Sequence, residues 1–318
     1  MNVHLTFDIE VWCNGWNNLD GNFPAAFERY VYGRSAKGEY ALPRTLEVLA
    51  QHGLKGVFFV EPLFAARFGI RYLKIIVDLI KAGGHDIELH LHPEWTDEIR
   101  PLLFAGATRK RQHLSYYTLE EQTALIRRGI ELMAEAGCPR LHAFRSGSFA
   151  CNADTFAALR ECGIAVDSSL NEIYPDSGAD LRGKLDLTQP KVVDGLTLLP
   201  MTLFRDGTGR LRPAQVGACS AAELRAALDA AHAAGQGHFV LLSHNFEMLK
   251  QAGSEPDPIV ARRFEALCRY LAQNQDRFEV AVLDTTPRVA PTAPPLPRVP
   301  LHATLQRHGE QLLRRFIG

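Results

Sequence analysis

The sequence has almost no net charge and no long apolar run. Its 35 lysines and arginines are balanced by 36 aspartates and glutamates, so the formal net charge is −1. A balanced chain provides no strong field for nucleic acid or an anionic membrane. The only basic cluster, Arg109–Arg111, is short and is expected to be solvated. No stretch approaches the roughly 18 apolar residues of a membrane span. We therefore expect neither a nucleic-acid partner nor a transmembrane segment.

The cysteines also lack a functional pattern. Six cysteines are scattered over 318 residues, and no two have CxxC spacing. In a chain of this size we expect reduced and mostly buried thiols. The chain enters a strand-like run at once, without a charged and apolar leader, so a cytoplasmic location is expected.

Short apolar runs alternate with amphipathic stretches along residues 1–286. "TLEE" (residues 118–121) and "SAAE" (residues 220–223) each predict a capping box at the start of a helix, and "FEVAVLDT" (residues 278–285) predicts a final strand. The alternation predicts an α/β fold of parallel βαβ units, and one closed or nearly closed α/β barrel of about seven parallel strands fits it better than two domains. An open doubly wound sheet is the alternative, although no GxGxxG segment supports it. We assign residues 1–286 to the barrel and residues 287–318 to a proline-rich linker and a short amphipathic C-terminal helix. That helix is expected to pack back on the barrel, with docking to a partner or membrane surface as the alternative.

An acidic pair stands at the end of the first strand-like run, "HLTFDIEVW" (residues 4–12). Leu5, Phe7 and Ile9 alternate with polar residues, which predicts a half-buried strand. Asp8 and Glu10 then point to the same side. Two like charges so close repel each other unless a cation or a shared proton lies between them.

A second cluster follows in "GHDIELHLHPEW" (residues 84–95). If the strand persists, His90 and His92 share a face, with Glu88 and Glu94 on either side. Imidazoles and carboxylates converging at a strand end are the usual ligands of zinc or another divalent cation. The two clusters together predict a metal site.

Three more strand-like runs end in residues that can do chemistry, namely Arg145, Asp167 and His244. Each alone also fits a structural role, as a salt bridge, a turn carboxylate or a buried histidine. Barrel enzymes carry their catalytic groups at the carboxyl ends of strands. Five such ends together favour an active site.

The five segments "TFDIE", "GHDIELHLHPEW", "RSGSF", "VDSS" and "LLSHN" resemble, in this order, the motifs of the polysaccharide deacetylase family, carbohydrate esterase family 4. The resemblance extends from Thr6 to about Leu283. It implies a deformed (β/α) barrel, a divalent metal (zinc first, with manganese, iron or cobalt as alternatives) and hydrolysis of an N-acetyl group on a sugar.

The resemblance also implies residue roles. Asp8 would be the general base and Arg145 would contact it. His244 would be the general acid, Asp167 would support it, and Leu242 would line the acetyl pocket. Trp95 and Phe149, in the second and third segments, are further candidates for substrate contact.

Two departures from the family pattern affect the metal ligands. Ile9 separates the two acids, so the metal carboxylate would be Glu10. The family's second motif has histidines four residues apart, whereas Glu94 stands four residues after His90 and His92 lies between them. The third ligand is therefore His92 by chemistry or Glu94 by position, and both are kept.

The sequence therefore predicts a metal-dependent hydrolase that deacetylates an amino sugar, an oligosaccharide or a glycan precursor. One alternative is a hydrolase of a small cyclic amide on the same fold. Another is a non-catalytic relative that binds a metal or a glycan, and Glu94 keeps this reading open.

Overall fold

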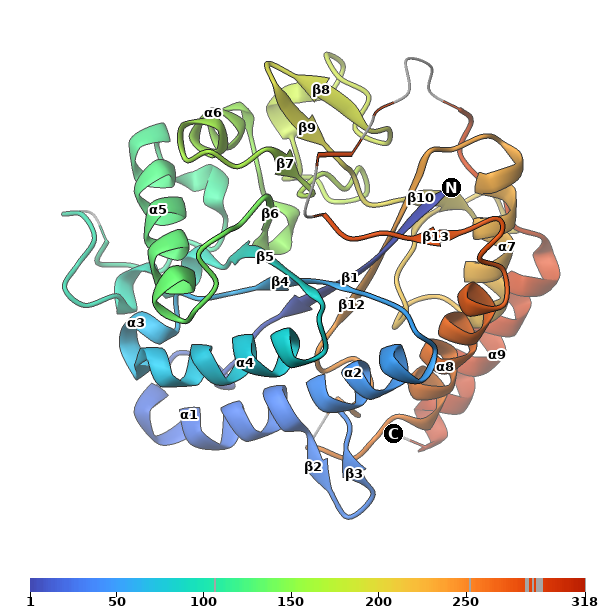
Figure 1. Cartoon of the computed structure of the whole chain (residues 1–318), viewed down its shortest axis with the longest axis horizontal. Coiled ribbons are helices and arrows are strands. Elements are labelled where there is room, and N and C mark those ends of the chain that lie inside the picture. Colours follow the sequence, from blue (N-terminus) through green and yellow to red (C-terminus); the bar gives the residue numbers. More distant parts are fainter. Residues whose placement is uncertain (106, 252, 284–285, 288, 290–293, 318) are drawn as a thin grey trace. The chain divides into compact units, whose positions relative to one another are not determined.

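The computed structural model describes residues 1–105, 107–251, 253–283, 286, 287, 289 and 294–317. These residues form two compact units, which are interleaved along the chain. Figure 1 labels their helices and strands. The first unit contains residues 1–56 and 202–281 and the described part of 292–318; the second contains residues 57–201 and the described part of 282–291. The predicted domain boundary at residue 286 stays a prediction, and residues 288 and 290–293 of the predicted linker lie outside the described residues.

The first unit is built on parallel strands. β1 (Asn2–Ile9) pairs with β12 (His238–His244) and with β13 (Glu279–Val280), in both cases in parallel. The register sets Asp8 opposite His244. The sequence predicted a half-buried first strand, but His4, Thr6 and Asp8 are buried as fully as the apolar residues between them. A parallel strand is covered on both faces, which explains the difference.

Helices and short hairpins complete this unit. Its helices are α1 (Leu19–Phe27), α2 (Leu42–Gln51), α7 (Ala221–Ala233), α8 (Pro258–Ala272) and α9 (Leu301–Ile317), with a π-turn at Glu28–Tyr32. Its hairpins are β2 (Arg34–Ser35) with β3 (Gly38–Glu39), and β10 (Leu203–Arg205) with β11 (Leu211–Pro213). A capping box of Ser220 and Glu223 opens α7, as "SAAE" predicts.

The C-terminal helix α9 packs on its own chain, as expected. It lies beside α7, which also contacts α8 (Figure 1). Arg307 of α9 is buried and donates to Glu223 at 3.0 Å and to Asp206 at 3.1 Å. Buried charges persist only when they are paired, so these bonds tie α9 to α7 and to the end of β10.

The second unit has strands β4 (Val57–Val60), β5 (Asp86–Leu91), β6 (Ala143–Ser146), β7 (Val166–Asp167), β8 (Lys191–Val193) and β9 (Leu196–Leu198), in the order β4-β5-β6-β7-β9-β8. All neighbours are parallel except β8 and β9. Its helices are α3 (Ala65–Phe68), α4 (Ile70–Ala82), α5 (Leu119–Glu135) and α6 (Ala153–Glu161), with 3₁₀ turns at Pro93–Glu98, Leu114–Tyr116, Gly147–Phe149 and Ala179–Leu181. The alternation of strands and helices confirms the predicted α/β class.

The register of the second unit gathers its candidate residues. His90 lies opposite Arg145, and Phe144 lies opposite Asp167. The carboxyl ends of β5, β6 and β7 therefore meet at one edge. None of the described helices combines the length and the apolar character that a membrane crossing requires.

Candidate functional site

Three ionisable residues of the first unit form a cluster that fits a cation. Asp8, Glu10 and His244 each offer a ligand atom, and these atoms lie within 4.8 Å of one another. The parallel register of β1 and β12 brings them together, because both strands end at the same edge. Asp8 and Glu10 are buried. Carboxylate oxygens are ligands that divalent metals accept, and so is an imidazole nitrogen that carries no proton, so the two carboxylates of this cluster fit a metal.

Asn245 fastens the end of β1 to the end of β12. Its side chain accepts from the Glu10 amide at 3.2 Å and donates to the Glu10 carbonyl at 3.1 Å. Its own amide donates to the Asp8 carbonyl at 3.3 Å. The indole of Trp12 donates to Glu10 Oε2 at 2.6 Å. These bonds hold Asp8 and Glu10 in place. The sequence alone assigned no role to Asn245 or Trp12.

Glu247 is a further residue that sequence reasoning missed. His244 Nδ1 donates to Glu247 Oε1 at 3.1 Å. The same carboxylate accepts from Gln215 at 2.6 Å and from the Gly217 amide at 2.8 Å. Burial lowers the pKa of His244, but the Glu247 hydrogen bond and the charges of Glu10, Glu247 and Asp8 outweigh burial and raise it to about 9. His244 is therefore cationic at neutral pH in this arrangement.

In the second unit, His90 and His92 stand side by side, with ring centroids 4.8 Å apart. Nδ1 of His90 lies 2.7 Å from the Arg145 carbonyl, which only accepts, so this nitrogen carries a proton. In the neutral ring Nε2 then has the lone pair, as in many metal-ligating histidines. Nδ1 of His92 lies 3.3 Å from Glu94 Oε2. The structure thus brings together both candidates for the third ligand.

Arg145 and Asp167 are completely buried in the same unit. Arg145 donates to the carbonyl and the hydroxyl of Ser168 at 3.2 and 3.1 Å and lies over the ring of Phe59. Asp167 accepts from the Ser169 amide at 3.1 Å and from its hydroxyl at 2.6 Å. Burial raises the pKa of Asp167 to about 6, against the opposing effect of these bonds and of the Arg145 charge.

The "RSGSF" segment has an unusual backbone at the end of β6. Ser148 and Phe149 both have positive φ, 54° and 56°, which non-glycine residues rarely adopt and which cluster at functional sites. Gly147 lies so close to His92 that a Cβ there would be 2.6 Å from the imidazole. The glycine is therefore required for the position of His92.

The predicted substrate residues are buried near these strand ends. Leu242 lies in β12 of the first unit, while Trp95 and Phe149 belong to the second unit. Trp95 packs edge-on against Phe68, and Phe149 packs against the partly exposed Tyr174. Phe149 is slightly more exposed than Trp95, at 7% against 1%.

The sequence matches no protein family model and no curated protein. Among solved structures, it resembles one from Mycobacterium smegmatis described as a "putative polysaccharide deacetylase", with 22% identity, a TM-score of 0.56, and coverage of 93% of this chain and 94% of the other. A family 4 carbohydrate esterase from Streptomyces lividans matches at 14% identity and a TM-score of 0.43, covering 92% and 98% of the two chains. A family 4 pseudoenzyme from Bacillus anthracis matches at 14% identity and a TM-score of 0.40, covering 89% and 63%.

The Mycobacterium match establishes the fold. The chain has the deformed (β/α) barrel fold of the polysaccharide deacetylase structures over nearly its whole length, as the five motifs predict. At this identity the likeness concerns the fold alone, so the activity must be argued from the residues.

Proposed function

We propose that the protein is a metal-dependent hydrolase that removes N-acetyl groups from an amino sugar, an oligosaccharide or a glycan precursor. The observation that carries this proposal is the convergence of Asp8, Glu10 and His244 within 4.8 Å at the ends of paired strands. This cluster combines a carboxylate base, a cationic acid and a metal-type carboxylate. The five ordered motifs and the shared fold support the same reading.

We propose Glu10, His90 and either His92 or Glu94 as ligands of a divalent cation, with zinc as the preferred metal. The ligand types fit that group, and the Nδ1 bond of His90 directs its Nε2 to the role of ligand. A bound cation would supply a Lewis acid that polarises the acetyl carbonyl. The oxygen-rich alternative with Glu94 would favour a harder cation such as manganese.

The protein's own residues move the protons. Asp8 takes a proton from the attacking water while the water oxygen forms a bond to the acetyl carbon. Arg145 keeps Asp8 ionised, as the resemblance implies. His244 gives its proton to the sugar nitrogen as the C–N bond breaks. The products are acetate and a free amino sugar.

Glu247 is the positioning residue that we propose for His244. Its bond to Nδ1 leaves the proton on Nε2 as the one to be transferred, and it also favours the cationic ring. The resemblance assigns the support of His244 to Asp167, whose own hydrogen bonds go to Ser169. Glu247 and Asp167 are therefore the two candidates for supporting His244, and variants of each distinguish them.

Leu242, Trp95 and Phe149 are the proposed contacts with substrate, with Leu242 beside the acetyl group. The aromatic segment before residue 40 is a further candidate, because Tyr30 packs edge-on against Phe246, which in turn packs against His244. A cytoplasmic substrate is proposed because the cysteines form no disulfide in the described part of the chain, and four of the six are buried.

Docking through α9 is a second, separate role that one observation favours. Leu305, Leu312 and Leu313 of this helix are more than half exposed. Such a stripe is compatible with a protein or membrane-surface partner.

The substitution Asp8→Asn tests the proposed reaction. We expect the variant to fold and to bind metal, but to release acetate from N-acetylated chitooligosaccharides at least about 100-fold more slowly, because it lacks the general base. Full activity of this variant would refute the role of Asp8. Bound metal without acetate release by the wild-type protein would favour a cyclic-amide hydrolase or a binding protein.

A further inference from the structure

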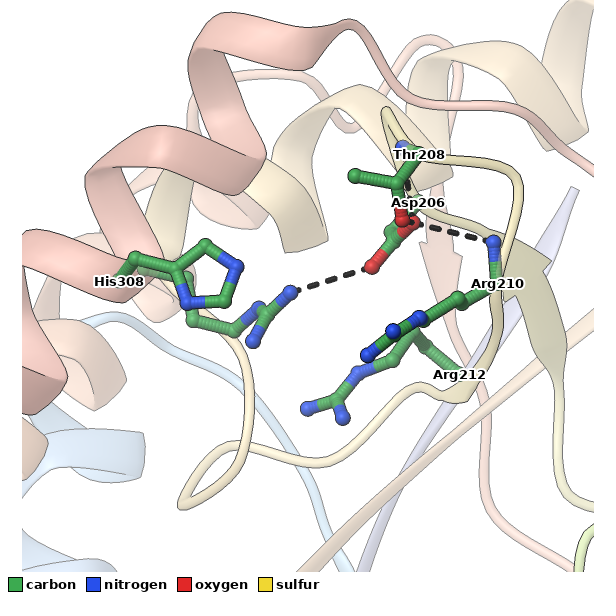
Figure 2. Close-up of a pocket in the computed structure, with 6 residues that line it drawn as sticks. Asp206, Thr208, Arg210, Arg212 and His308 are labelled. Carbon is green, nitrogen blue, oxygen red and sulfur yellow. Dashed lines mark hydrogen bonds and ion pairs between the residues drawn. The ribbon is translucent and has the colours of Figure 1, made fainter.

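A cavity lies in the first unit, between the β10–β11 hairpin and helix α9 (Figure 2). Its volume is about 430 Å³, and its lining residues are Asp206, Thr208, Arg210, Arg212, Arg307 and His308. This size is typical of a site for a small organic ligand. None of these residues belongs to the proposed catalytic machinery.

Among the lining residues only Asp206 has a carboxylate, and both of its oxygens already accept hydrogen bonds. Asp206 Oδ1 accepts from the amide and the hydroxyl of Thr208 at 2.9 and 2.7 Å and from the Arg210 amide at 3.1 Å. Its Oδ2 accepts from Arg307. These bonds lower the pKa of Asp206 against the opposing effect of burial, so the group stays ionised and occupied. The cavity therefore offers no carboxylate for an incoming cation.

The cationic side chains that line the cavity, in contrast, make few hydrogen bonds and ion pairs. Arg307 is balanced by Asp206 and Glu223 through its Nε and one terminal nitrogen. Arg212 donates to the Ala218 carbonyl at 3.0 Å, but its buried Nε has no hydrogen-bond partner. Within the described part of the chain, the side chains of Arg210 and His308 make no hydrogen bond or ion pair. Two guanidinium charges thus face the cavity without a carboxylate partner.

The side chains converge on one space. Figure 2 shows Arg210 and Arg212 extending from the hairpin toward α9, which presents His308. Arg307 of the same helix also lines the cavity. An array of separate N–H donors around a cavity suits a group with several oxygens and two negative charges. A phosphate monoester meets both conditions, whereas a carboxylate has one charge and two oxygens.

We propose that this cavity binds the phosphate group of a small phosphate ester of about the size of a sugar phosphate. The two uncompensated arginines would neutralise the dianion, and the remaining volume would hold the organic part. The proposal does not depend on the deacetylase activity.

Isothermal titration calorimetry on the full-length, metal-loaded protein tests it with glucose 1-phosphate, inorganic phosphate and glucose. We expect saturable binding of about one glucose 1-phosphate per chain, weaker binding of inorganic phosphate and none of glucose. Arg210→Ala should lower the affinity for glucose 1-phosphate at least about tenfold, because a charged hydrogen bond is lost. Arg140→Ala, at an exposed loop arginine, is the matched control and should change nothing.

Three outcomes would overturn the proposal. The first is the absence of binding by glucose 1-phosphate. The second is binding that Arg210→Ala leaves intact and Glu10→Gln abolishes, which would place the phosphate at the metal ligands. The third is equal binding of inorganic phosphate and the ester, which would show that the organic part has no place in the cavity.

Discussion

At the scale of single residues, two carboxyl groups are candidates for orienting His244. Glu247 hydrogen-bonds its Nδ1, whereas Asp167 hydrogen-bonds Ser169. We expect Glu247→Gln to lower kcat for acetate release about 10- to 100-fold with little change in KM, because the amide cannot stabilise the cationic ring. Steady-state kinetics on Glu247→Gln and Asp167→Asn, with the metal content of each variant checked, would show which carboxyl group orients His244.

Asp167→Asn is the comparison for this experiment. If Glu247 is the positioning residue, the Asn variant retains more activity than the Gln variant. A larger loss of kcat in Asp167→Asn would return the role to Asp167.

Gly147 offers a test of His92 as a ligand. A methyl group at this position would lie 2.6 Å from the imidazole, so Gly147→Ala should displace the ring. If His92 binds the metal, affinity measured by metal titration should fall about 10- to 100-fold. Gly237→Ala is the control, because a Cβ there meets nothing within 4 Å. Unchanged metal affinity in Gly147→Ala would favour Glu94 as the third ligand.

The strand-end residues could be predicted from the sequence, but their supporting partners could not. Alternation of apolar residues identifies Asp8 and Glu10 as neighbours on one face. Glu247 lies in the turn after β12, and its role depends on bonds to Gln215 and Gly217, which lie 32 and 30 positions earlier. No local pattern encodes such a bond.

At the scale of elements, β1 and β12 share a buried histidine pair. His4 Nδ1 donates to the Ala281 carbonyl at 3.1 Å, and His4 Nε2 accepts from His238 Nδ1 at 3.1 Å. Burial, together with the electrostatic effect of His238, lowers the pKa of His4 to about 3, against the effect of the Ala281 bond. A proton on Nε2 would face another donor, so the fold requires the neutral ring.

This pair predicts a loss of stability in acid. The unfolded chain binds a proton at His4 below pH 6.5, but the folded protein binds it only near pH 3. Stability therefore falls as the pH drops from 6.5 toward 3, by about 2 kcal/mol at pH 5 from this group. The free energy of unfolding of wild type and His4→Gln, measured with a denaturant at pH 7.5 and pH 5, tests this loss of stability.

In that experiment the substitution should flatten the pH dependence, while the exposed His302→Gln should leave it as in wild type. An equally steep dependence in His4→Gln would show that other groups cause the acid sensitivity.

Element boundaries were predicted well where capping chemistry is local. The capping boxes at Thr118 and Ser220 open α5 and α7 as predicted. The final strand is shorter than the apolar pattern over residues 278–285 predicts, since only Glu279 and Val280 pair with β1. Residues 284 and 285 lie outside the described residues. Pairing depends on the neighbouring strand as well as on the apolar pattern.

At the scale of the whole molecule, the alternation of strands and helices along the sequence predicted the α/β class and a barrel. The resemblance of the five motifs implied that the barrel is deformed, and the fold agrees. The composition of the first unit could not be predicted in the same way. It combines residues 1–56 and 202–281 with the described part of 292–318, and this grouping depends on contacts between distant segments such as β1 and β12. The charged contacts of Arg307 with Asp206 and Glu223 likewise span 101 and 84 residues.

The central claim is that the protein deacetylates a sugar with the help of a bound divalent metal. The most direct measurement is acetate release from N-acetylated chitooligosaccharides by the purified protein, before chelation, after chelation and after zinc or manganese is returned. The account predicts about one divalent ion per chain, loss of acetate release on chelation and recovery with the metal. Acetate release that is unaffected by chelation, from a protein shown to be free of metal, would contradict it.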